Sequence, residues 1–231
     1  MFGTTYTSGI MDYRSASEIN SAMARVYGHM SVAVIISMMV SWFVGSTPEL
    51  LAFFFTGILK WIVIFAPLAA ILTLSFASQR FNTGQLKLFL YSFAALMGLS
   101  MATIFAIFTM GSIVSAFMGA AILFAVMSGY GYFTKQSLDS MGKFMLVGLI
   151  AIIIASIVNI FIGSTVMQMV ISALAIIIFL GLTAYDTQKI REAVSVSGDT
   201  GREEVMGALT LYMDFINLFI NLLQLFGIKK D

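Results

Sequence analysis

Two aspartates lie in or beside apolar segments near the end of the chain. Asp186 belongs to the stretch IIIFLGLTAYDTQKI, and Asp214 belongs to GALTLYMDFINLFINLLQLFG. A carboxylate at membrane depth is costly unless it is paired, neutralised or hydrated, so such residues usually mark ion or proton pathways. These two carboxyl groups are therefore the first candidates for function.

The two aspartates are more informative as a pair. If their segments form a tightly returning pair of helices, both carboxyl groups lie at the same membrane level. Like-charge repulsion and desolvation then favour a shared proton, and the pair titrates as one coupled unit that could sense pH. Asp186 alone is less informative, because Thr187, Gln188 and Lys189 follow it and could place it in the headgroup region.

A nearby cation would instead hold the pair ionised. Arg80, at the end of the second apolar run and on the same predicted side of the membrane, is the best candidate for such a latch. An anchor at the membrane interface is an equally good interpretation of Arg80. His29 is the only histidine and lies at the start of the first apolar run. We interpret it as an interfacial side chain, although histidine titrates near neutral pH.

Composition identifies the bilayer as the solvent and main partner of the chain. Of its 231 residues, 60% are hydrophobic and 10% are charged, whereas about a quarter are charged in an average soluble domain. The net charge is only +1 and no segment concentrates Lys and Arg, so nucleic-acid binding is not expected. The chain has no cysteine, which excludes disulfides, thiol nucleophiles and thiolate metal sites.

The pattern of apolar runs predicts an all-α membrane protein with seven transmembrane helices. Each run has about 20 residues, the length that crosses roughly 30 Å of hydrocarbon. A polar N-terminal tail, residues 1–25, precedes one bundle over 26–231, and residues 187–205 are predicted to form a polar loop. The predicted spans are 27–45, 57–78, 87–109, 112–133, 144–163, 166–186 and 206–228.

The distribution of Lys and Arg predicts the orientation, since cytoplasmic loops carry the excess of positive charge. Nine of the 12 fall on one side, and Lys60, Lys229 and Lys230 fall on the other. The N-terminus is therefore predicted to be cytoplasmic. The C-terminus is outside if the last segment crosses fully, and cytoplasmic if that segment enters and returns. The nine are Arg14, Arg25, Arg80, Lys87, Lys135, Lys143, Lys189, Arg191 and Arg202.

The last apolar segment carries a polar stripe. At 100° per residue, Asp214, Asn217, Asn221 and Gln224 fall within an arc of about 80°. Unsatisfied amides and carboxylates are costly in hydrocarbon, so the stripe should face protein or water at the centre of the bundle. The three amides are either hydrogen-bonding contacts between helices or the lining of a water path, and we favour the former.

The chain resembles the Bax inhibitor-1 family (transmembrane Bax inhibitor motif proteins), in its bacterial branch. The similarity is close at GLTAYDTQKI and at LTLYMDFINLFINLLQLFG, where Met213 stands in place of the usual leucine. Weaker similarity extends through VYGHMSVAVIISMMVSWFV, FMGAAILFAVMSGYGYFTKQSL and GKFMLVGLIAIIIASIVNIF. It covers nearly everything after residue 25.

The resemblance implies seven helices, with the polar seventh at the centre of two three-helix layers. It also implies a calcium leak across a bacterial inner membrane, controlled by protonation of two aspartates. Residue matching assigns this pair to Asp186 and Asp214. Counting back from Tyr91 and Phe93 assigns the arginine that latches the closed state to Arg80.

Calcium is the cargo that the resemblance implies, and no cofactor is expected. Calcium prefers six to eight oxygen ligands, so two carboxylates with some amides and water bind it weakly, as conduction requires. Asp186 and Asp214 are thus predicted to coordinate calcium only transiently. The long basic C-terminal tail of eukaryotic members is reduced to Lys229 and Lys230, so cell-death regulation is not expected.

Two other classes of function compete with a leak. Intramembrane aspartyl proteases also use two aspartates, but they carry Gly-x-Gly-Asp and Pro-Ala-Leu. Here Leu211, Tyr212 and Met213 precede Asp214. Asp-Thr-Gly at 199–201 is interpreted as a turn, and no enzyme activity is predicted. The third class is a regulatory partner of a membrane-bound protease or quality-control complex, with residues 1–25 as the contact.

Overall fold

The structure is a computed structural model that describes residues 14–196 and 200–230. Within these residues the regular elements are helices. They are α1 (Ala16–Gly45), α2 (Pro48–Phe55), α3 (Leu59–Ala77), the short 3-10 helix η1 (Ser78–Arg80), α4 (Thr83–Ser100), α5 (Ile104–Ile107), α6 (Met110–Phe133), α7 (Asp139–Ile162), α8 (Thr165–Val196) and α9 (Thr200–Phe226).

Seven helical segments in the described chain are long and apolar enough to cross a membrane, which confirms the predicted fold class. The third crossing is built from α4, a turn and the single-turn helix α5. The short helix α2 links α1 to α3 and begins with Pro48, a residue whose fixed φ suits the first turn of a helix. Each crossing corresponds to one of the predicted apolar runs.

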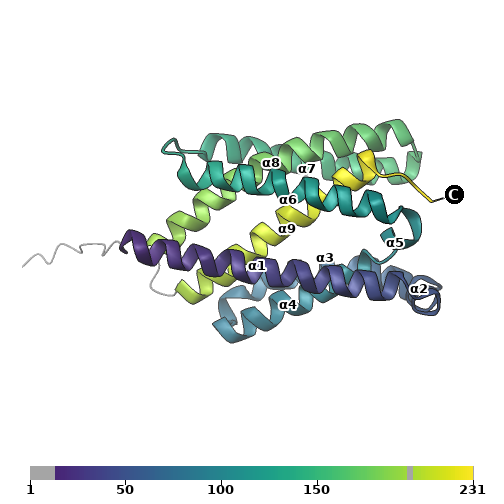
Figure 1. Ribbon diagram of the computed structural model, residues 1–231, viewed down its shortest axis with the longest axis horizontal. Coiled ribbons are helices and arrows are strands. Elements are labelled where there is room, and N and C mark those ends of the chain that lie inside the picture. The colour runs from purple at the N-terminus through teal and green to yellow at the C-terminus, as the bar shows by residue number, and fades with distance from the viewer. Residues whose placement is uncertain (1–13, 197–199, 231) are drawn as a thin grey trace, which may run out of the picture.

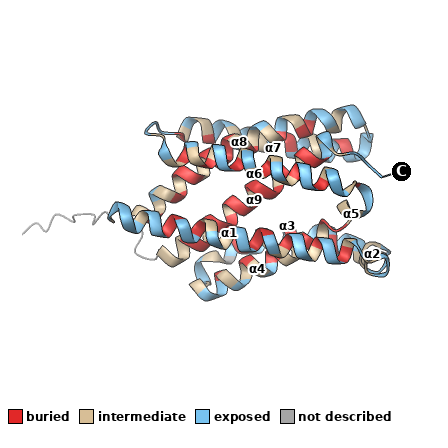
Figure 2. Cartoon of the chain, in the orientation of Figure 1, coloured by how far each residue is buried: buried red, intermediate tan, exposed pale blue. Residues whose placement is uncertain are grey.

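The helices form two layers around a central helix. Helices α1, α3 and α4 lie on one side, α6, α7 and α8 on the other, and α9 runs obliquely between them (Figure 1). In the apolar stretch of α9, 67% of the residues are buried, against 39% or less in the other six crossings. The buried surface accordingly follows α9 (Figure 2). Of the polar stripe, Asp214 is buried, Asn217 and Asn221 are half-buried, and Gln224 near the end of the helix is exposed.

The predicted loop at 187–205 is wrong. Helix α8 continues to Val196, ten residues beyond Asp186, and α9 already begins at Thr200. The reason is an amphipathic pattern that polarity alone conceals. Thr187, Ile190 and Val194 are buried at helical spacing, so this segment packs on the bundle while its polar face leaves the hydrocarbon.

The polar segment 1–25 is partly helical. Residues 16–25 form the first turns of α1, and residues 1–13 lie outside the described part of the chain. Ser15 begins the helix with a capping box: its hydroxyl accepts from the Glu18 amide, and the Glu18 carboxylate accepts from the Ser15 amide at 2.8 Å. These bonds satisfy amide groups that no helix can pair internally.

The start of α1 and the end of α9 lie at opposite ends of the bundle (Figure 1). This arrangement corresponds to seven full crossings rather than a last segment that enters and returns. The nine Lys and Arg predicted to share one side belong to the end where α1 begins. We call this end the cytoplasmic end, following the positive-inside rule, and the other the outer end.

Candidate functional site

The structure brings Asp186 and Asp214 together. Asp186 lies on α8 and Asp214 on α9, and their carboxyl groups are within hydrogen-bonding reach of each other. The side chain of Asp214 is only 4% exposed, whereas Asp186 is half-buried. Asp214 is 14 residues from the start of α9, or about 21 Å along the axis. Asp214 therefore lies near the midpoint of α9, and Asp186 lies beside it on α8, ten residues before that helix ends.

The surroundings of Asp214 favour a proton shared with Asp186. Within residues 14–196 and 200–230, its Oδ2 is buried and accepts no hydrogen bond from an N–H or O–H group. Ionised carboxylates can only accept hydrogen bonds, so a hydrogen bond between two carboxyl groups exists only if one of them is protonated. Two adjacent buried carboxylates without a proton would repel each other in a region of low dielectric.

Close packing of α8 holds Asp186 in place. A Cβ on Gly131 of α6 would lie 2.1 Å from the backbone oxygen of Ala184, and a Cβ on Gly207 of α9 would lie 2.7 Å from Ile190. Both contacts leave no room for a larger residue. Small residues let helices approach closely in membranes, where lipid supplies no hydrophobic drive for association. Helix α8 is therefore held from two sides around its aspartate.

A row of hydroxyl groups joins three helices beside the pair. Tyr27 of α1 bonds Ser128 of α6 at 2.7 Å, and Ser128 bonds Thr187 of α8 at 2.9 Å. Thr187 is fully buried and follows Asp186 in the chain. Sequence reasoning missed this row because serine, threonine and tyrosine are common in membrane helices, and only the packing of α1, α6 and α8 places them in line.

Arg80 lies apart from the aspartates. It is exposed in η1, and in the described residues no ion pair or hydrogen bond joins it to Asp186 or Asp214. The turn that carries Arg80 is held by another arginine, since Arg202 of α9 donates to the carbonyl oxygens of Ser78 at 2.8 Å and Phe81 at 3.0 Å. The role of Arg80 as a latch stays a prediction.

The amides of the α9 stripe have different partners. Gln224 accepts from Gln168 at 2.7 Å and from Ser172 at 3.1 Å, so it joins α9 to α8 as the predicted contact between helices. Asn217 and Asn221 instead donate to carbonyl oxygens of α9 itself, four residues earlier, at 2.8 and 2.9 Å. Their donors are thereby satisfied without a partner helix or water.

His29 has a specific partner. Its Nδ1 lies 2.7 Å from the hydroxyl of Tyr91 on α4, and the ring is half-buried. The bond joins α1 to α4 within one layer of the bundle. His29 therefore has a structural role between helices in addition to its position near the cytoplasmic end.

A buried ion pair at the cytoplasmic end escaped the sequence analysis. Arg25 of α1 donates to both carboxylate oxygens of Glu204 on α9, at 2.9 and 2.7 Å. The Glu204 side chain is 7% exposed, against 53% for Arg25. A usable signal was present, because one basic and one acidic residue open the first and last spans at the same predicted membrane level. The pair ties the start of the central helix to α1.

Arg25→Ala is expected to lower the thermal unfolding midpoint, because it leaves the Glu204 carboxylate, which is 7% exposed, without its charged partner. The loss should be smaller than for a fully buried pair, because water partly screens Arg25. Thermal unfolding in detergent measures the effect. Glu204→Gln is the matched control. It keeps a hydrogen-bond acceptor for Arg25 and removes the buried charge, so the Glu204→Gln protein should lose less stability than the Arg25→Ala protein. Equal losses in both variants would contradict this account.

Apolar and aromatic side chains close the bundle on the outer side of the pair. Phe117 of α6 packs against Phe215 and Phe219 of α9, with ring centroids 5.4 and 6.0 Å apart, and Phe124 packs against Phe215 at 5.8 Å. We call Phe117, Phe124, Phe215 and Phe219 the aromatic cluster. Hydrophobic constrictions stop ions by excluding water. The aromatic cluster has the composition of such a constriction.

The site offers a cation few ligands. Among the described residues, no group of three or more His, Cys, Asp or Glu could hold a metal ion. The two aspartates supply at most four carboxylate oxygens, fewer than the six to eight that calcium prefers. A bound calcium ion would need water for the remainder, which makes the site suited to brief contact rather than storage.

These features define a class of protein: a multi-pass membrane protein whose central helix carries a buried acidic pair. The family described as "Inhibitor of apoptosis-promoting Bax1" matches residues 19–231. The chain belongs to this Bax inhibitor-1 family, as its motifs at Asp186 and Asp214 predicted.

Curated relatives match along almost their whole length. Inner membrane protein YbhL of Escherichia coli (strain K12) is 36% identical over 92% of this chain and 93% of its own. A Lactococcus lactis protein, YrjE, is 34% identical over 95% of both chains. A Caulobacter vibrioides protein is 30% identical over 100% of this chain and 99% of its own. The chain is similar to these bacterial proteins over the entire seven-helix bundle.

Proposed function

We propose that the protein is a pH-sensitive calcium leak channel of a bacterial inner membrane, gated by protonation of Asp186 and Asp214. The observation that carries this proposal is the close approach of the Asp186 and Asp214 carboxyl groups between α8 and α9, where the buried Asp214 Oδ2 has no hydrogen-bond donor among the described residues. A buried group of this kind is costly and is seldom kept without a role in moving ions or protons. The inner membrane follows from the similarity to YbhL.

The chemistry of the pair links protons to cations. With its shared proton, the pair carries a hydrogen bond and at most one negative charge. Without that proton, two carboxylates face each other, and either a cation enters between them or α8 and α9 move apart. Both responses change the packing beside the aromatic cluster, because Phe215 follows Asp214 on the same helix. Loss of the shared proton thus changes the packing of the aromatic cluster. We assign no catalytic role to the pair.

Flux measurements in liposomes test the proposal. Purified protein is reconstituted around a calcium-sensitive dye, and calcium entry is followed as the pH is varied. The parent protein should show a pH-dependent flux, and Asp186→Asn and Asp214→Asn should each abolish the pH dependence. Glu49→Gln removes an exposed acid of α2 and is the matched control, which should behave as the parent. Unchanged pH dependence in both asparagine variants would overturn the two-aspartate mechanism.

The double variant sharpens the test. Groups that titrate as one unit give strongly non-additive effects when both are removed. Asp186→Asn combined with Asp214→Asn should therefore show the same pH-independent flux as either single variant. Absence of flux from the parent protein under every condition would instead favour the regulatory partner of a membrane-bound protease.

A further inference from the structure

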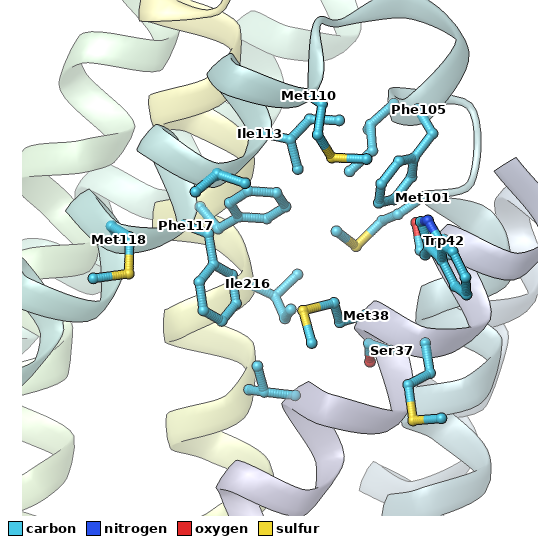
Figure 3. A pocket seen from close by; sticks show the side chains of 16 residues that line it. Ser37, Met38, Trp42, Met101, Phe105, Met110, Ile113, Phe117, Met118 and Ile216 are labelled. Atoms are coloured by element: carbon cyan, nitrogen blue, oxygen red, sulfur yellow. The ribbon is translucent and has the colours of Figure 1, made fainter. Parts of the chain in front are cut away.

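An apolar cavity opens sideways from the bundle, toward the outer end. It lies between α1, the α4–α5 turn and α6, and Ile216 and Phe219 of α9 line it from the centre of the bundle (Figure 3). Its volume is about 370 Å³, within the roughly 300–1,000 Å³ of small-molecule sites. Methionines from α1, α6 and the α4–α5 turn contribute to its wall, among them Met38, Met101 and Met110. Flexible thioether side chains suit an occupant that adopts many conformations.

The mouth of this cavity faces lipid. Trp42 of α1 is 53% exposed and Met118 of α6 is 54% exposed, and both line the cavity (Figure 3). In a bilayer these surfaces contact acyl chains. Apolar cavities stay free of water, so the molecule available to fill this one is a membrane lipid.

One polar group inside the cavity lacks a partner. Ser41 is 2% exposed and lines the cavity, and its hydroxyl makes no hydrogen bond within the described residues. The hydroxyl of Ser37, one turn earlier, bonds the Ala94 carbonyl at 2.7 Å and the Tyr212 hydroxyl at 2.6 Å. An unpaired buried hydroxyl costs about 1–3 kcal/mol. An acceptor atom on the occupant would remove that cost.

The depth of Ser41 indicates which acceptor this is. Ser41 lies four residues before the end of α1 at Gly45, about 6 Å along the helix axis. This is just inside the outer end of the hydrocarbon region. The ester carbonyls of a glycerophospholipid lie where its acyl chains join the headgroup region, so a lipid with one chain in the cavity would bring an ester oxygen to this level.

A cation lies at the outer rim. Lys230 lines an adjoining hollow that shares Phe105, Met110 and Ile113 with the cavity. Its ammonium group is exposed and donates to the Phe105 carbonyl at 2.7 Å, which leaves two further N–H donors. The C-terminal segment is held there by two backbone bonds, Lys230 to Ile107 at 2.8 Å and Thr109 to Ile228 at 3.0 Å. The charge at the rim is therefore fixed in position.

We propose that this cavity binds an anionic glycerophospholipid of the surrounding bilayer. One acyl chain fills the methionine-rich cavity, an ester carbonyl accepts a hydrogen bond from Ser41, and the phosphate group contacts Lys230. The site is separate from the aspartate pair and stands whether or not the protein conducts calcium. Its occupant packs on Ile216 and Phe219, and so holds the central helix between the two layers.

Quenching of Trp42 by brominated lipids tests the site. The chain has two tryptophans, so Trp61→Phe leaves Trp42 as the single tryptophan, which is excited selectively at wavelengths that tyrosine does not absorb. This protein is reconstituted in phosphatidylcholine vesicles with small fractions of phosphatidylglycerol or phosphatidylcholine carrying brominated chains. Brominated phosphatidylglycerol should quench Trp42 at about fivefold lower mole fraction, the ratio expected for one lysine beside an anionic headgroup. Equal quenching by both lipids would overturn the proposal.

Three variants of this protein separate the bound lipid from the lipid that surrounds every membrane protein. Lys230→Gln should remove the preference for phosphatidylglycerol, whereas Lys60→Gln, which removes an exposed lysine of the same end, should keep it. Val114→Phe places a ring at the mouth of the cavity and should weaken quenching by both lipids. An equal loss of preference in both lysine variants, or quenching unchanged by Val114→Phe, would identify only surrounding lipid and overturn the proposal. Circular dichroism and gel filtration confirm that each variant folds.

Discussion

Gly131→Ala is expected to destabilise the bundle by about 3 kcal/mol or more, the upper range for an overpacked core. The added methyl carbon would lie 2.1 Å from the backbone oxygen of Ala184 and 2.8 Å from its carbonyl carbon. Backbone atoms cannot turn away as a flexible side chain can, so α6 and α8 must separate. Thermal unfolding in detergent should show a strongly lowered midpoint or a protein that does not fold.

The same helix provides the control for this prediction. Gly129 has no atom within 4 Å of an added Cβ, so Gly129→Ala should be neutral or stabilise α6 by a few tenths of a kcal/mol up to about 1 kcal/mol. Ala184 lies two residues before Asp186. Any Gly131→Ala protein that does fold should therefore also show an altered pH dependence of flux. Equal unfolding midpoints for the two glycine variants would contradict the close contact between α6 and α8.

Phe219→Ala is expected both to destabilise the protein and to raise the calcium leak that we propose for it. Phe219 is 6% exposed, packs against Phe117 and lines the lateral cavity. Its removal costs about 3–5 kcal/mol in a well-packed core, and somewhat less here because one side already borders open volume. It also removes one ring of the aromatic cluster that excludes water on the outer side of Asp214.

Flux and unfolding together distinguish these effects. Phe226→Ala, at the 71% exposed end of the same helix, should change neither. The Phe219→Ala leak should be higher than that of the parent at every pH while keeping its pH dependence, since both aspartates remain. A destabilised variant with an unchanged leak would show that the aromatic cluster supports the fold but does not limit conduction.

Local signals were sufficient for the fold class and for the two aspartates. Hydrophobic runs of membrane length need no tertiary information, because the bilayer imposes the length and the internal hydrogen bonding of each helix. The polar stripe of α9 likewise predicted a helix enclosed by the others, since lipid cannot satisfy it. Asp214 stood out for the same reason, since a carboxylate in an apolar helix has a high free-energy cost whatever its partner.

Sequence patterns failed to predict the structure where the polarity of a residue does not indicate whether it is buried. Residues 187–196 are polar enough to suggest a loop, yet they continue α8 outside the hydrocarbon, where an amphipathic helix needs apolar residues on one face only. Arg25 and Glu204 are ordinary interfacial residues when taken singly. Their separation in the chain is 179 residues, and the signal that they could meet is their shared predicted membrane level rather than a local pattern.

The amino-acid sequence alone therefore accounts for the seven helices of membrane length and for two carboxyl groups in or beside them, because each depends on the free energy of single residues in lipid. Helix packing accounts for the rest: that Asp186 and Asp214 lie within hydrogen-bonding reach of each other, that Arg80 does not reach them, and that the cavity lined by Ser41 adjoins the hollow lined by Lys230. These relations depend on which faces of distant helices meet. That is set by close contacts such as the one between Gly131 and Ala184, which have no local signature in the chain.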